Sequence, residues 1–226
     1  MITRLPRWVL LGGLTLAFIG GMVNAGGYLS FYHQAVTHMT GTTTLLGIAF
    51  ATGDAREIVK FGSVALSFLL GAALSGLIIR DSTLHLGRRY GIALCVESAM
   101  LFIATPLMAG SHESGLWLAA AACGLQNAMA SSYSGTVVRT THMSGLYTDL
   151  GMFFGQWLRG IAQDARRVRL YVVLVLGFLG GGVVAAWLFP RFGEYSLLAP
   201  AALTGLVGVT YAFYRHRHLP VADSVA

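Results

Sequence analysis

The sequence predicts an all-α integral membrane protein, and its composition is the first observation that predicts this class. Hydrophobic residues make up 55% of the 226 residues, charged residues only 11%, and the mean hydropathy is +0.67. A soluble domain carries about 25% charged residues. With so little polar surface, the apolar helices must face lipid. The formal net charge of +6 comes from basic residues between the apolar stretches, which indicates membrane topology signals rather than nucleic-acid binding.

The apolar stretches are the second observation. A hydrocarbon core of about 30 Å takes about 20 residues of helix, and six stretches meet this length. They are residues 8–29, 61–79, 90–109, 116–133, 170–189 and 195–214. Two further stretches, 39–53 and 143–158, are shorter and carry several hydroxyl groups. We expect these two to be short re-entrant or broken segments rather than lipid-facing spans.

An internal repeat is the third observation. The sequence GMVNA at 21–25 matches GLQNA at 124–128, and HMTG at 38–41 matches HMSG at 142–145. The spacing between the two motifs is nearly the same in both copies. We therefore expect one membrane domain made of two repeats, residues 1–110 and 111–226.

The positions of Lys and Arg distinguish two topologies. If the short segments cross the membrane, the halves are parallel, and ten basic residues lie inside against five outside. If they do not cross, the halves are inverted, and the distribution is twelve against three. Cytoplasmic loops carry the excess of basic residues. We therefore expect six transmembrane helices, an inverted internal repeat and cytoplasmic termini.

These motifs resemble a known family. HMTG at 38–41, GLQNA at 124–128 and RTTHMSG at 139–145, followed by TDLG at 148–151, are similar to the YoaK family of bacterial membrane proteins, also called the DUF1275 domain. The resemblance covers nearly the whole chain. It implies a six-span protein of the bacterial inner membrane and no particular biochemical activity. This copy differs at Thr42, where the first motif usually has Asn, and at Ser144, where the second usually has Thr.

Polar residues in the apolar segments are the main functional indication, because they are costly in hydrocarbon unless satisfied internally. In an inverted repeat, equivalent short segments can meet near the midplane and point their N-terminal N–H groups into a shared cavity. We therefore expect a small-solute transporter or channel. The candidate substrate-binding residues are Asn24, His38, Thr40, Gly41, Thr44, Asn127, His142, Ser144, Gly145, Thr148 and Asp149.

Two intramembrane carboxylates need a partner or water. Asp149 has the apolar Leu45 as its counterpart, and Arg139 and His142 are the nearest residues that could pair with it. The alternative places Asp149 at the membrane edge beside a loop arginine. Glu97, inside the span at 90–109, is the candidate for proton coupling, and the alternative role is an interhelical hydrogen bond.

A structural interpretation stands beside the functional one. Ser and Thr in membrane helices often bond to carbonyls of their own helix, and pairs such as Gly151/Gly155 and Gly177/Gly181 commonly serve helix packing. If the motifs only pack helices, the protein is a non-transporting scaffold or sensor.

Enzyme and metal chemistry are not expected. The sequence has no catalytic motif, no glycine-rich phosphate loop and no metal-ligand spacing typical of a helix, so we expect no cofactor either. Cys95 and Cys123 lie inside apolar runs and are expected to be packing residues. The expected partners are membrane lipid and a small solute or ion, and nucleic acid is not expected. The sequence is compatible with either a monomer or a homo-oligomer.

Overall fold

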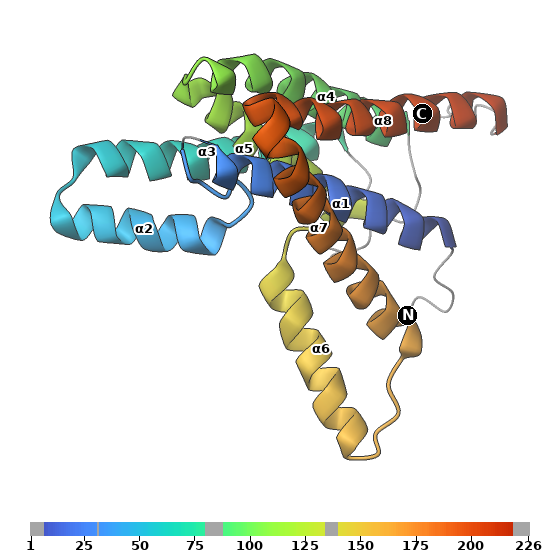
Figure 1. Ribbon diagram of the computed structural model, residues 1–226. Helices are drawn as coiled ribbons and strands as arrows, with labels where there is room; N and C mark the ends of the chain where they lie inside the picture. Colours follow the sequence, from blue (N-terminus) through green and yellow to red (C-terminus); the bar gives the residue numbers. More distant parts are fainter. Residues whose placement is uncertain (1–6, 31, 80–87, 134–139, 219–226) are drawn as a thin grey trace.

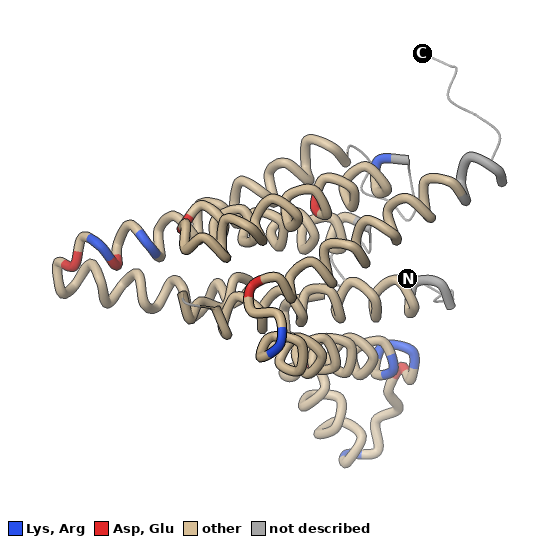
Figure 2. The backbone as a smooth tube through the Cα atoms, turned by 45° about the horizontal axis from the view of Figure 1, so that its top comes forward, with Lys and Arg blue, Asp and Glu red and all other residues tan. Residues whose placement is uncertain are grey.

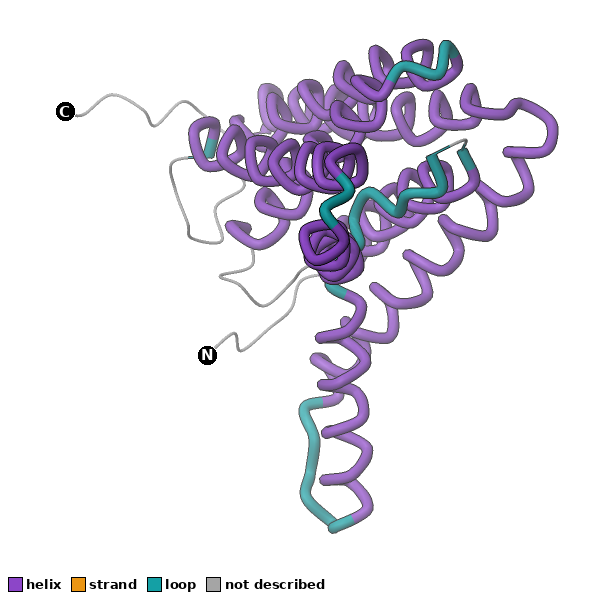
Figure 3. Tube along the Cα trace, turned by 90° about the vertical axis from the view of Figure 1, so that its left-hand side faces the viewer, coloured by secondary structure: helices purple, strands orange, loops and turns teal. Residues whose placement is uncertain are grey.

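The computed structural model describes residues 7–30, 32–79, 88–133 and 140–218, and all regular structure within them is helical (Figures 1 and 3). The predicted all-α class is confirmed. The elements in chain order are α1 (Arg7–Leu29), α2 (Met39–Thr52), α3 (Ala55–Ile78), α4 (Arg88–Ala109), α5 (Glu113–Tyr133), α6 (Met143–Leu158), α7 (Ala165–Phe192), the 3-10 helix η1 (Gly193–Leu197) and α8 (Leu198–His218).

Four segments of the described chain are long and apolar enough to cross a membrane. They are Leu10–Leu29, Ala55–Ile78, Arg89–Ala109 and Ala165–Phe213, the last of which takes in α7, η1 and α8. The predicted span in α5 is not among them. Residues 119–126 of α5 are almost all buried against other helices, so this helix does not need the apolar side chains that contact with lipid requires. The remaining apolar helices fit a membrane protein.

The two short segments are helices α2 and α6, with bounds close to those predicted. Each is one continuous helix, so neither is broken. Each forms a hairpin with the helix that follows it, α2 with α3 and α6 with α7, and the two hairpins leave the body of the molecule in different directions (Figures 1 and 3).

Two long helices begin earlier than their apolar stretches predict. α3 begins at Ala55 rather than residue 61, and α7 begins at Ala165 rather than residue 170. The residues before them, Asp54 and Asp164, cap the helices. The charged first turns therefore extend each helix beyond its apolar part. Figure 2 shows the same separation, with most charged residues near helix ends.

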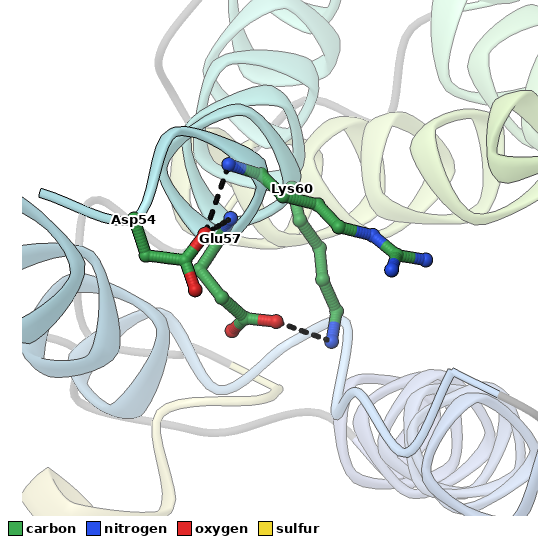
Figure 4. A network of polar contacts seen from close by, with 4 residues as sticks. Asp54, Glu57 and Lys60 are labelled. Atoms are coloured by element: carbon green, nitrogen blue, oxygen red, sulfur yellow. Dashed lines mark hydrogen bonds and ion pairs between the residues drawn. The ribbon is translucent and has the colours of Figure 1, made fainter.

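The Asp54 cap shows how such a start is stabilised (Figure 4). The carboxylate accepts hydrogen bonds from the backbone N–H groups of Arg56 at 3.0 Å and Glu57 at 3.1 Å. A capping carboxylate satisfies N–H groups that have no partner within the helix. Lys60 lies 3.7 Å from Glu57 one turn further on. Asp164 caps α7 in the same way, so the two halves begin these helices alike.

Helices of one half pack closely against helices of the other. α1 crosses α7, and α5 crosses α3. At these crossings, a Cβ on any of four glycines would overlap a backbone carbonyl of the facing helix. The contacts are Gly21 with Phe178, Gly181 with Phe18, Gly124 with Phe68 and Gly71 with Ala121. The first two join α1 to α7 and the last two join α5 to α3, so the two crossings have matching geometry.

The end of α1, the start of α5 and η1 lie together. Tyr32, shortly after α1, is buried in a cluster with Leu116 of α5 and Leu197 of η1. Burial, together with the negative charges of Glu113 and Glu194, raises the pKa of Tyr32. Because α1 ends where α5 begins, these two counterpart helices run in opposite directions.

The last helices of the two halves, α4 and α8, also pack against each other. Gly91 lies against Gly208, whereas Ser98, further along α4, donates a hydrogen bond to the carbonyl of Ala201 at 2.8 Å. From the first contact to the second, the residue number rises in α4 and falls in α8, so the two helices are antiparallel.

Only one of the two predicted small-residue pairs makes a helix contact. Gly177 and Gly181 lie directly against the backbone of α1, whereas a Cβ at Gly151 or Gly155 would meet no atom within 4 Å among the residues described. The packing interpretation therefore applies to the pair in α7.

We expect Gly21→Ala to destabilise the fold and Gly47→Ala to leave it intact. A methyl group at position 21 must displace the backbone of Phe178, and overpacking of a filled contact costs about 1–3 kcal/mol. Gly47 lies in α2 with no atom within 4 Å of its Cβ position, where alanine favours the helix. Thermal unfolding of the purified chain in detergent measures both variants. Equal stability of the two would contradict the close crossing.

Candidate functional site

The two short helices begin with the same local structure. His38 precedes α2 with φ −89° and ψ 64°, and His142 precedes α6 with φ −90° and ψ 63°. Each imidazole ring folds over the first turn of its helix, where a Cβ on Gly41 or Gly145 would overlap it. The glycine of each motif therefore makes room for the histidine ring. Neither histidine side chain caps the N–H groups of that turn.

Asn24 and Asn127 hold the chain just before each short helix. Asn24 Oδ1 accepts hydrogen bonds from the Thr37 backbone N–H at 3.0 Å and from the Thr37 hydroxyl at 2.7 Å. Asn127 Oδ1 accepts a hydrogen bond from the Thr141 hydroxyl at 3.0 Å. Because these threonines directly precede the two histidines, the asparagines position both helix starts.

Both helix starts converge on one turn of α1. Thr37 is bonded to Asn24, and Thr141 lies one turn earlier, where a Cβ on Gly20 would be 2.9 Å from the Thr141 methyl group. In Figures 1 and 3, α2 and α6 begin close together near the middle of the molecule and then diverge. The structure therefore brings the two motif starts to the same part of α1, although the helices that follow lie apart.

Two of the predicted hydroxyl ligands bond to their own helix. Thr44 donates to the carbonyl of Thr40 at 3.0 Å, and Thr148 donates to the carbonyl of Ser144 at 2.9 Å. All four residues are exposed on the short helices. The Thr44 and Thr148 hydroxyl protons are therefore used within the helix, as the structural interpretation predicts.

Asp149 lies beside Tyr171 of α7, a residue that sequence reasoning did not propose as its partner. The Tyr171 side chain is within hydrogen-bonding reach of the Asp149 carboxylate. Phe153, one turn further along α6, stacks on Tyr171 with ring centroids 5.8 Å apart. Of the two partners predicted for Asp149, Arg139 lies outside the described residues and the His142 ring folds over its own first turn. Tyr171 therefore links the carboxylate to α7.

Glu97 is buried in α4 and does not face lipid, with 2% of the residue exposed. Within the described part of the chain, its Oε2 atom has no hydrogen-bond partner. It lies near enough to Cys123 of α5 to interact with it electrostatically. The alternative role of Glu97, an interhelical hydrogen bond, is therefore not seen for Oε2 among the described residues.

Sequence reasoning missed Gln126 and Thr140. These residues are 1% and 0% exposed, and neither Gln126 Nε2 nor Thr140 Oγ1 has a hydrogen-bond partner among the residues that the structure describes. Their counterparts in the first half are the apolar Val23 and Val36. A comparison of the two repeats for polar residues in place of apolar ones would have found both.

An all-helical chain with long apolar helices and two polar helix starts at its centre defines a membrane protein with several membrane-crossing helices. Residues 12–210 match the family described as a protein of unknown function (DUF1275), so the chain belongs to the DUF1275 family. The predicted family is confirmed. No curated protein and no solved structure matches the chain.

We expect Asn24→Ala to destabilise the protein more than Asn127→Ala. The first change leaves the Thr37 backbone N–H without its acceptor in a buried position, which costs about 1–3 kcal/mol. Among the described residues, the second removes the acceptor of the Thr141 hydroxyl, which can rotate toward another oxygen. Thermal unfolding of the two variants in detergent tests this order. A greater loss for Asn127→Ala would contradict the assignment of the two bonds.

Proposed function

We propose that the protein is a small-solute transporter or channel of the bacterial inner membrane, with a substrate site between the starts of α2 and α6. The convergence of these two equivalent helix starts on the turn of α1 from Gly20 to Asn24 carries the proposal. Helix N-termini attract polar and anionic groups. In membrane transporters, such helix starts near the midplane commonly form the substrate site.

The predicted site residues have different places in this proposal. The backbones around Gly41 and Gly145 and the rings of His38 and His142 line the site. Asn24 and Asn127 hold both helix starts in position, while the remaining residues lie on α2 and α6 as these helices leave the site. Those residues are Thr40, Thr44, Ser144, Thr148 and Asp149.

The proposal includes six crossings arranged as two inverted repeats, residues 1–110 and 111–226. The opposite directions of α1 and α5, the matching glycine crossings and the matching aspartate caps support it. The excess of basic residues on one side supports it independently. Both termini are then cytoplasmic.

A second candidate function is a non-transporting membrane scaffold or sensor. The hydrogen bonds from Thr44 and Thr148 to carbonyls of their own helices favour it, because these hydroxyls are then not available as donors to a solute. Neither candidate is an enzyme or needs a cofactor.

Labelling of two equivalent cysteines tests the inverted arrangement. Ala55→Cys and Ala165→Cys, in a background with Cys95→Ser and Cys123→Ala, place a thiol in the exposed first turns of α3 and α7. We expect a membrane-impermeant maleimide added to whole cells to label position 55, and to label position 165 only after the membrane is opened. Labelling of both positions only from the cytoplasmic side would restore the parallel eight-span arrangement.

Uptake into proteoliposomes under an imposed pH gradient tests transport. We expect Glu97→Gln, which resembles the neutral acid, to fold normally and to lose the pH dependence of uptake. Asp149→Asn should lower uptake at normal expression, because it removes the charge beside Tyr171. Glu113→Gln, at the exposed start of α5, is the matched control.

Two results would contradict parts of this scheme. Uptake that is independent of pH and unchanged in both variants would remove proton coupling and leave a passive channel. No uptake of any tested solute above that of empty vesicles would favour the scaffold or sensor.

A further inference from the structure

We infer that the substrate is a small monovalent anion, bound between the starts of α2 and α6 and by the side-chain donors of Gln126 and Thr140. This inference rests on the proposed transport function and narrows it to one substrate class. It combines the backbone at the two helix starts with two buried side chains whose donors have no hydrogen-bond partner among the described residues.

The two helix starts supply about one unit of positive charge. A helix N-terminus is equivalent to about half an elementary charge. Thr37 and Thr141, which lead into α2 and α6, lie at the same turn of α1, and the two helices have 14 and 16 residues. Their first turns contain no acidic residue, and the preceding histidine side chains do not cap them. The first turns also contain no Lys or Arg that would call for a more highly charged anion. Two such starts therefore match a single negative charge.

The Gln126 amide lies at the same place on α1 as Thr141, which leads into α6. Its Oε1 atom lies 3.3 Å from the Cβ position of Gly20, and the Thr141 methyl group lies 2.9 Å from the same position. Gln126 is 1% exposed, and its Nε2 donor has no partner in the described residues. An unsatisfied buried donor costs about 1–3 kcal/mol. An anion at the start of α6 would offset this cost.

Thr140 adds a second donor on the same segment. Thr140 lies two residues before His142, the N-cap residue of α6. It is fully buried, and its Oγ1 atom has no hydrogen-bond partner among the described residues. The next residue, Thr141, is held by Asn127. The backbone at Thr140 is therefore held close to the helix start, and within the described part of the chain nothing else engages its hydroxyl.

The first half of the chain shows that the fold does not need these donors. The counterparts of Gln126 and Thr140 are Val23 and Val36, which are 2% and 0% exposed. The same packing positions thus accept apolar side chains. Gln126 and Thr140 therefore place polar groups near the start of α6 where packing alone does not require them, and this combination indicates a binding role.

The two intramembrane carboxylates do not occupy the proposed site. Asp149 lies beyond the first turn of α6 and beside Tyr171, and Glu97 lies on α4 beside Cys123. The helix starts therefore present donors without a competing acidic side chain in their first turns. This arrangement favours an anion over a cation.

The test replaces each of the two residues by valine, the residue at the equivalent position of the first half. Gln126→Val and Thr140→Val are compared with the unmodified chain by thermal unfolding in detergent, with nitrate or formate against sulfate at equal ionic strength. We expect both anions to raise the melting temperature of the unmodified chain. The variants should be as stable or more stable without anion, because an unpartnered buried polar group is removed. Their apparent affinity for nitrate and formate should fall about tenfold or more.

Ser75→Ala is the matched control. Ser75 lies on α3, is buried with no hydrogen-bond partner for its hydroxyl in the described residues, and has the apolar counterpart Ala185. This variant removes the same kind of group outside the proposed site. We expect it to keep the full response to nitrate and formate.

Uptake of labelled formate into proteoliposomes separates this inference from the proposed function. Stabilisation by formate that needs Gln126, without any uptake, would support the anion site and contradict transport. Uptake of neutral or cationic solutes that Gln126→Val does not change, without any effect of nitrate or formate, would support transport and overturn the anion site. An equal response to nitrate and formate in all variants would also overturn it.

Discussion

The contact between glycines and the facing backbone at two helix crossings is the constraint on which the rest of the structure depends. Lipid supplies no hydrophobic force between helices, so close van der Waals packing must hold them together. Gly21 and Gly124 allow this packing at equivalent places. Asn24 and Asn127 follow one turn later on the same helices, and they fix the starts of α2 and α6. The position of the candidate site is therefore set by the crossings.

The two halves of the chain differ in polarity at equivalent positions, and the polar residue lies in the second half at some of them and in the first half at others, as Ser75 and its counterpart Ala185 show. Gln126 and Thr140 stand where the first half has valines, and Asp149 with Tyr171 stands where the first half has Leu45 and Phe61. The backbone repeats its geometry, down to the angles of the two histidine caps. The halves thus share a framework while their side chains have diverged, which gives the centre of the molecule two unequal sides.

Composition and the apolar stretches predicted the all-α class and the bounds of α2 and α6, whereas the family was predicted from the resemblance of the repeated motifs. The starts of α3 and α7 were missed because hydropathy does not register a capping aspartate such as Asp54. Tyr171 could not be named as the neighbour of Asp149, because it lies on the next helix and the packing of that hairpin brings the two together. A comparison of the two repeats finds Gln126 as a polar residue opposite a valine, but its burial and its lack of a partner among the described residues are properties of the folded chain.

The exchange of partners between the halves has a consequence for biosynthesis. α1 pairs with α7 and α3 pairs with α5, so a nascent chain that has left the ribosome only as far as α4 has two glycine faces with nothing to cover them. Those faces stay against lipid until the later helices are inserted. Synthesis of the second half supplies the facing helices α5 and α7, so the two glycine crossings form only after both of these helices have been inserted.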